Sequence, residues 1–170
     1  MFLKKQIISI SMAKFVDLSY ERILKEQSEI LLQFNFIEML VATLITNFYF
    51  KKISKERAYF FSDILYDPSI TAYVKIRFLK NILKQKKIDH KVCDKLAELN
   101  RIRNLFAHVS YVHEDFDKNL DKKWYARKYS NFEKPIDLNE QYKIFIKLVP
   151  EVHDILDDLE KKLLSSRKKI

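Results

Sequence analysis

Residues 97–111, AELNRIRNLFAHVSY, place an arginine, an asparagine and a histidine inside an otherwise apolar helical run. Because successive helical residues are turned by about 100°, Arg103 and His108 project about 140° apart, and one helix cannot aim both side chains at one point. The sector between them holds only small and polar residues, namely Cys93, Ala97, Asn100 and Asn104. Asn104 lies one turn before His108, so its amide can hold the imidazole in a fixed orientation. We therefore place the candidate site in a groove along this sector.

The other side of the same helix indicates the fold. It carries a wide apolar arc made of Val92, Leu96, Leu99, Ile102, Leu105, Phe106 and Val109. Such an arc is typical of a helix that packs in a bundle. The chain has 170 residues, of which 48% are hydrophobic, and this fits one compact domain over residues 1–170. The absence of glycine excludes Gly-rich phosphate loops and dinucleotide-binding turns, and it favours an all-α fold.

The charge and the cysteine content of the chain indicate in which compartment the protein works and what kind of partner it binds. The single cysteine, Cys93, excludes an intrachain disulfide and favours a reducing cytoplasm. The formal net charge of +9 favours a polyanionic partner, either RNA or an anionic lipid surface. The first 15 residues do not resemble a signal peptide, because two serines and a lysine interrupt their apolar run.

The apolar run at residues 30–50 is long enough to suggest a membrane span. Gln33, Asn35 and Glu38 interrupt its first half, which is unfavourable in a bilayer. We favour a buried helix in the centre of a bundle and expect no membrane association.

Apolar periodicity and capping residues predict about five helices. The first expected helix covers 2–25, with a break near Ser11 left open, and the second covers 28–51. A shorter helix capped by Ser54 should end before Pro68, and a helix over 70–85 should be capped by Ser69. A further helix, capped by Asp89, should run to His108. In the segment 70–85, Tyr73 should point inward and Lys75 outward. We interpret the basic outer face as solvated rather than as an RNA track.

A long loop insertion over residues 113–135 should follow, with short strands as an option. Apolar periodicity fails there, and aromatic residues alternate with basic ones. Single-stranded nucleic acid favours this composition, because charges track phosphates and rings stack on bases. The residues expected to bind RNA are Lys122, Lys123, Trp124, Arg127 and Lys128. The alternative is that the aromatic residues pack back onto the bundle.

The closing helix over residues 137–165 has the clearest pattern. Its apolar residues step by four and three from Leu138 to Leu163, which is a heptad seam. Asp137 with Glu140 resembles a capping box, and Pro150 should bend or restart the helix. The seam can pack within the domain or on a second subunit, and we favour the first.

The segment IRNLFAH resembles the mark of the HEPN superfamily, an arginine and a polar residue followed by a histidine. Arg103, Asn104 and His108 match it. The bare Arg–His spacing is common by chance, but the longer pattern late in a helix of a helical domain is more specific. The helix order over 28–110 is similar to HEPN proteins of the mannitol-operon-repressor group. The resemblance implies a HEPN-like bundle of about five helices, and the residue pattern adds the long basic loop before the last one.

The resemblance also implies a chemistry, the cleavage of RNA by its own 2′-hydroxyl. This reaction needs a base, an acid and positive charge on the phosphate, but no metal and no cofactor. Histidine can serve as base or acid near neutral pH, and arginine grips phosphate oxygens through its planar fork. One His108 and one Arg103 are too few, so the resemblance implies a homodimer with a composite site. We expect a metal-independent endoribonuclease of toxin or phage-defence type, with RNA and a protein antitoxin or regulator as partners.

The alternative is a non-enzymatic regulator or binding module, because several HEPN proteins, including the mannitol-repressor-like ones, act as regulators. Arg103 and His108 would then form interface or helix-end contacts. A metal site is not expected: His90 with Cys93 has a short ligand spacing but lacks a second pair. His153, among several aspartates on the closing helix, should be a surface histidine.

Overall fold

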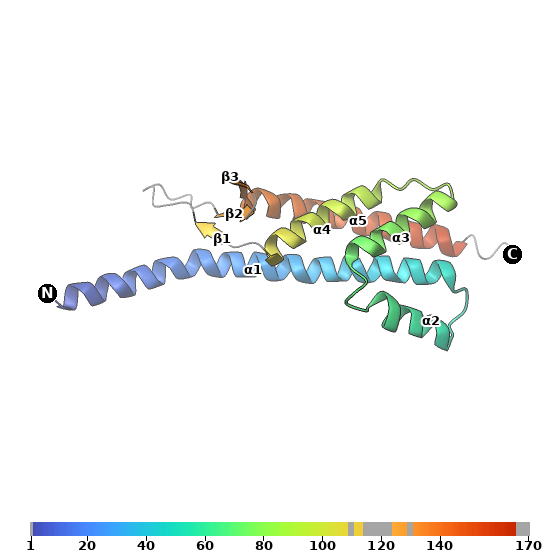
Figure 1. Ribbon diagram of the computed structural model, residues 1–170, viewed down its shortest axis with the longest axis horizontal. Coiled ribbons are helices and arrows are strands. Elements are labelled where there is room, and N and C mark those ends of the chain that lie inside the picture. Colours follow the sequence, from blue (N-terminus) through green and yellow to red (C-terminus); the bar gives the residue numbers. More distant parts are fainter. Residues whose placement is uncertain (1, 109–110, 114–123, 129–130, 166–170) are drawn as a thin grey trace.

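The computed structural model describes the backbone of residues 2–108, 111–113, 124–128 and 131–165, and the side chains of 21–108 and 136–163. It is an all-α bundle with a small sheet at one end, as expected from the sequence (Figure 1). The elements are α1 (Phe2–Tyr49), α2 (Lys55–Tyr59), the π-helical turn η1 (Phe60–Leu65), α3 (Ala72–Gln85), α4 (Val92–His108), β1 (Tyr111–His113), β2 (Trp124–Lys128), β3 (Asn131–Asp137) and α5 (Leu138–Ser165).

The first helix, α1, is one continuous helix of 48 residues, so the prediction of two helices over 2–25 and 28–51 is wrong. Ser28 was the expected start of the second helix. Its Oγ instead donates to the carbonyl of Leu24 at 2.8 Å, one turn back, so Ser28 lies inside the helix and does not begin it. Figure 1 shows that α1 extends well beyond the bundle toward the N-terminus.

The core is formed by α1, α3, α4 and α5, which pack against one another. On α1 the largest fully buried side chains include Phe34, Ile37 and Ile45. The stretch Glu21–Tyr49 is long and apolar enough to cross a membrane by length and composition alone. Its buried side chains belong to the same core as those of α4 and α5, as expected for a central bundle helix.

The closing helix packs within the domain, as favoured from its heptad seam. Leu138, Phe145 and Val152 are fully buried in the common core. Asp137 caps the helix, because its Oδ1 accepts from the backbone N–H groups of Asn139 at 2.9 Å and Glu140 at 3.2 Å. The helix runs unbroken through the exposed Pro150 and does not restart there.

The segment between α1 and α3 begins as predicted and then departs from the prediction. Ser54 caps α2 by accepting from Arg57 N at 3.2 Å. Ser69, however, does not cap α3: its own N–H donates to Asp67 Oδ1 at 2.7 Å, and Thr71 is the N-cap residue. The helix therefore begins at Ala72, two residues later than expected.

The orientation of α3 also differs from the prediction for two residues. Tyr73, expected inside, is 58% exposed, and Lys75, expected outside, is 4% exposed. The buried arc is centred on Leu79, and Lys75 lies one turn before Leu79 on the same face. Burial of the ammonium group is compensated by an ion pair with Glu38 of α1.

The region after α4 contains the short strands that were left as an option. β1, β2 and β3 form an antiparallel sheet in that order, with Tyr111 opposite Ala126 and His113 opposite Trp124. Of the residues expected to bind RNA, Trp124, Arg127 and Lys128 belong to β2, whereas Lys122 and Lys123 lie outside the described residues.

Candidate functional site

Helix α4 carries the predicted site on its last two turns. Its apolar face is buried through Leu96, Leu99, Ile102, Leu105 and Phe106. Gln27 of α1 donates from Nε2 to the backbone carbonyl of Phe106 at 2.9 Å, and this satisfies one of the carbonyls that a helix end leaves without an intrahelical partner. At the other end, Asp89 accepts from Lys91 N at 3.0 Å, in the turn before the helix rather than as its cap.

Arg103 is half-buried and held from two sides. Its guanidinium carbon lies 5.7 Å from the centroid of the Phe34 ring, a cation–π contact with α1. Its Nη1 donates to Asn104 Oδ1 at 2.9 Å. Among the described residues, no acceptor is within hydrogen-bond reach of its buried Nε. A guanidinium has five N–H donors, so this anchored group retains donors for a ligand.

Asn104 supports Arg103, a contact that the sequence did not predict. The sequence suggested that its amide would hold His108, but within the described residues its oxygen accepts from Arg103. A hydrogen bond donated by a charged guanidinium is stronger than one between neutral groups. Asn104 therefore helps to hold the guanidinium of Arg103, and its contact with His108 stays a prediction.

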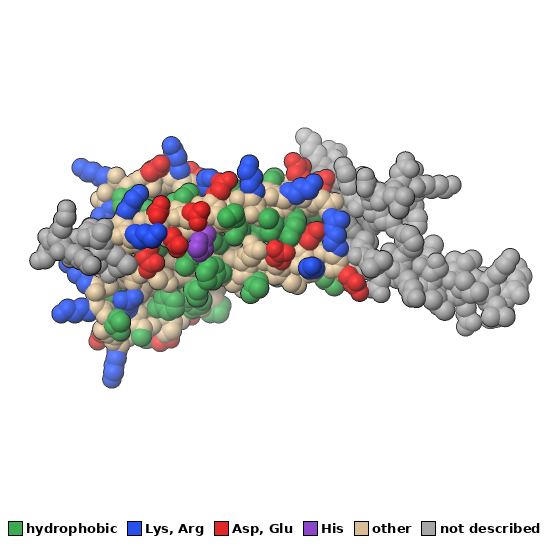
Figure 2. All heavy atoms as spheres, turned by 180° about the vertical axis from the view of Figure 1, so that it is seen from behind, with side chains coloured by type: hydrophobic (Ala, Val, Ile, Leu, Met, Phe, Trp, Pro, Cys, Tyr) green, Lys and Arg blue, Asp and Glu red, His purple; other side chains and the backbone are tan. Residues whose placement is uncertain are grey.

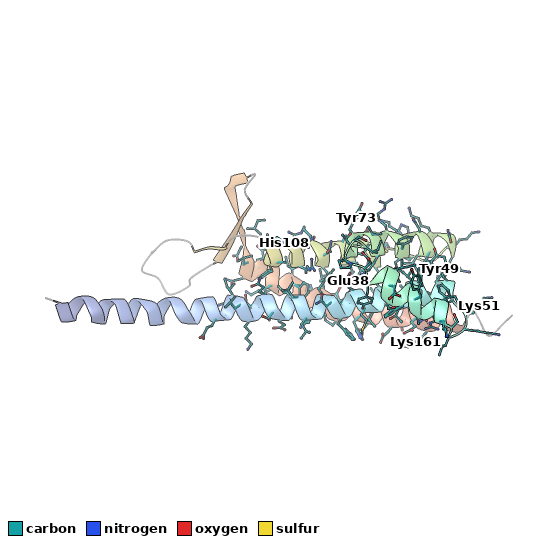
Figure 3. The ribbon with its side chains drawn as sticks, turned by 60° about the horizontal axis from the view of Figure 1, so that its bottom comes forward. Glu38, Tyr49, Lys51, Tyr73, His108 and Lys161 are labelled. Atoms are coloured by element: carbon teal, nitrogen blue, oxygen red, sulfur yellow. The ribbon has the colours of Figure 1, made fainter. Side chains whose placement is uncertain are left out.

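His108 is the last residue of α4 and is exposed, so its imidazole is accessible to a ligand. Figure 3 shows it near the end of the helix that faces the strands.

One pocket of about 710 Å³ brings the predicted residues together. From α4 it is lined by Asn100, Arg103, Asn104 and His108. Arg103 and His108 can line the same pocket although they project in different directions, because it follows the helix over more than one turn. Tyr73 and Glu38 also line it, and in Figure 3 they lie further along the bundle than His108.

The wall opposite α4 was missed by sequence reasoning. It is formed by Asn35 and Glu38 of α1 and by several residues between Tyr66 and Lys75. Lys75 Nζ lies 2.6 Å from Glu38 Oε1 and 5.0 Å from the centroid of the Tyr66 ring. Desolvation, and then the charge of Glu38, raise the pKa of Tyr66. The one available signal was an acidic residue, Glu38, within an apolar helical run.

Two other expectations concern residues outside this pocket. The basic and aromatic residues of 122–128 cannot be related to the pocket, because no side chain of that segment belongs to the described part of the structure. Within the described residues, no three His, Cys, Asp or Glu side chains are grouped as ligands of a metal ion.

No protein-family model, curated protein or solved structure is detectably similar to this chain.

Proposed function

We propose that the protein is a metal-independent endoribonuclease of the HEPN toxin or phage-defence type. The observation that carries the proposal is that Arg103 and His108, which both belong to α4, line the same pocket. His108 is accessible and can move a proton, and the anchored Arg103 can hold a phosphate oxygen through its fork. The net charge of +9 suits a polyanionic substrate.

The reaction that these groups support is attack of a ribose 2′-hydroxyl on the adjacent phosphorus. The base removes the 2′-hydroxyl proton, the new O–P bond forms, and the 5′-oxygen leaves with a proton from the acid. One imidazole cannot occupy both positions at once, so a second copy of His108 would supply the other. The proposal therefore includes a homodimer in which two pockets meet.

Exposed apolar side chains on α1 offer a second copy a surface that lies beside the pocket and not in it. Leu32, Phe36 and Met39 are 73%, 47% and 38% exposed, and Met39 lies one turn after Asn35, which lines the pocket. Exposed apolar stripes of this kind are typical of protein interfaces. Figure 2 shows apolar side chains gathered in a band across the back of the bundle, with charged side chains on both sides.

The second candidate is a non-enzymatic regulator that binds a partner through the same pocket. It is favoured by one observation, the engagement of Arg103 with Phe34 and Asn104, which is also what a structural arginine needs. The two candidate functions differ in whether the protein cleaves RNA.

The experiment that tests the enzyme is incubation of the protein with single-stranded RNA in EDTA, beside the same RNA methylated at every 2′-oxygen. We expect cleavage of the unmodified RNA into products with a 2′,3′-cyclic phosphate, and no cleavage of the methylated RNA, because the methyl group removes the nucleophile. Cleavage of both, or of neither, contradicts the proposal. Intact RNA in a stable complex would favour the regulator.

Arg103 and Asn104 should differ in the size of their effects. Arg103→Lys keeps the charge but loses the fork, so the single-turnover cleavage rate should fall by about 100-fold, the usual effect of losing one transition-state donor. Asn104→Ala should be milder, less than about tenfold, because it only loosens the guanidinium that Asn104 holds.

Sedimentation of both variants is the control for this comparison. Both should dimerise like the parent protein. The reverse ranking of rates, or loss of the dimer in Arg103→Lys, would assign Arg103 to the interface instead of to catalysis.

A further inference from the structure

The wall opposite α4 contains an exposed tyrosine that the proposed chemistry does not use. Tyr73, in the first turn of α3, is 58% exposed and lines the same pocket as Arg103 and His108. The guanidinium carbon of Arg77, one turn later, lies 5.8 Å from the centroid of the Tyr73 ring. Among the described residues, no aromatic ring is paired with Tyr73, so a flat ligand can stack on the ring face that Arg77 does not cover.

A second tyrosine, Tyr66, stands in a different environment. Its ring lies 5.1 Å from that of Phe61 and 5.0 Å from the ammonium of Lys75. These contacts, with the ion pair between Lys75 and Glu38, fix the wall in place. Tyr66 is therefore part of the support, and Tyr73 is the residue that remains available to a ligand.

We propose that Tyr73 is the stacking platform for a nucleobase next to the cleaved phosphate, so that the pocket binds single-stranded RNA. This inference rests on the proposed ribonuclease function. With the phosphate at Arg103 and His108, the neighbouring base extends along the pocket toward Tyr73, which Figure 3 shows further along the bundle. Arg77 then reaches the next phosphate of the strand.

The chemistry of this end of the pocket suits a base better than an aliphatic ligand. Stacking on an aromatic ring tolerates every base, because each has a π-face. The amides of Asn35 and Asn100 line the pocket and offer donors and acceptors to a base edge. A base held in a duplex cannot reach such a site, and this selects single strands.

The test measures binding of a fluorescent single-stranded RNA by anisotropy, with His108→Ala in every protein so that no RNA is cleaved. Tyr73→Leu should weaken binding by roughly 5- to 150-fold, the range for loss of one stacked base, and Tyr73→Phe should restore it. The matched control is Tyr59→Leu, because Tyr59 of α2 is equally exposed, at 59%, and is not among the residues that line the pocket. It should change the affinity less than twofold.

A second probe separates stacking from charge. Inorganic polyphosphate has no bases, so Tyr73→Leu should leave its affinity unchanged. Equal weakening of RNA and polyphosphate, or equal effects of Tyr73→Leu and Tyr59→Leu on RNA, would overturn the stacking role while leaving the ribonuclease proposal intact. Failure of the parent protein to bind RNA would overturn the ribonuclease proposal itself, and this inference with it.

Discussion

Replacing His108 by alanine should lower the single-turnover rate of RNA cleavage by at least about 100-fold and up to roughly 10,000-fold, the range for general acid–base catalysis. The expected loss lies toward the upper end, because in a homodimer one substitution removes the imidazole from both copies. His108 is exposed at the end of α4, and alanine is a good helix former, so the free energy of unfolding should change by less than about 0.5 kcal/mol.

The matched control is His90→Ala. His90 lies in the turn before α4 and is not among the residues that line the pocket, so the cleavage rate of this variant should equal that of the parent protein. Measuring cleavage in EDTA with identically purified proteins separates the outcomes. Equal cleavage by the parent and His108→Ala would identify a contaminating nuclease and remove the support for an enzyme.

Long-range periodicity explains why part of the fold could be predicted from the sequence. The seam of α5 repeats over seven turns, and only burial of that face satisfies every one of its apolar residues. In α4 the apolar arc is buried as well, and Asn100 and Asn104 of the polar sector line the pocket, whereas Cys93 of that sector is buried in the core. In both helices the sequence pattern was long enough to show which face is buried, although for α5 it left open whether that face packs within the domain or on a second subunit.

The boundaries of α1 and α3 could not be predicted, because serine has more than one use in a helix. Ser28 was expected to begin a helix and Ser69 to cap one, yet Ser28 bonds back to Leu24 and Ser69 belongs to the turn formed by Asp67. A serine before an apolar run marks a helix start only if its side chain accepts from the following turn, as that of Ser54 does.

The wall opposite α4 could not be predicted either, for a different reason. Lys75 is buried because it meets Glu38, which is 37 residues away in the chain. Local periodicity assigned a lysine to the solvent, and only the packing of α3 on α1 provides the carboxylate. Residues whose environment depends on one distant partner leave no signal within their own helix.

The ion pair between Glu38 and Lys75 leads to the largest expected effect on stability. The side chain of Lys75 is 5% exposed and that of Glu38 is 18% exposed, and their charged atoms are 2.6 Å apart. Glu38→Ala leaves the ammonium buried without its partner, which should lower the free energy of unfolding by roughly 3–5 kcal/mol. Removing both charges in Glu38→Leu with Lys75→Met should recover most of this loss, because apolar residues of similar size fill the same space.

The control is Asp158→Ala, which breaks the exposed pair with Lys161 and should change stability by less than about 1 kcal/mol. Urea unfolding of the four proteins measures these differences. If Glu38→Ala were no more harmful than Asp158→Ala, the pair would be solvated in solution, and Glu38 would be free to bind a ligand in the pocket instead of supporting its wall.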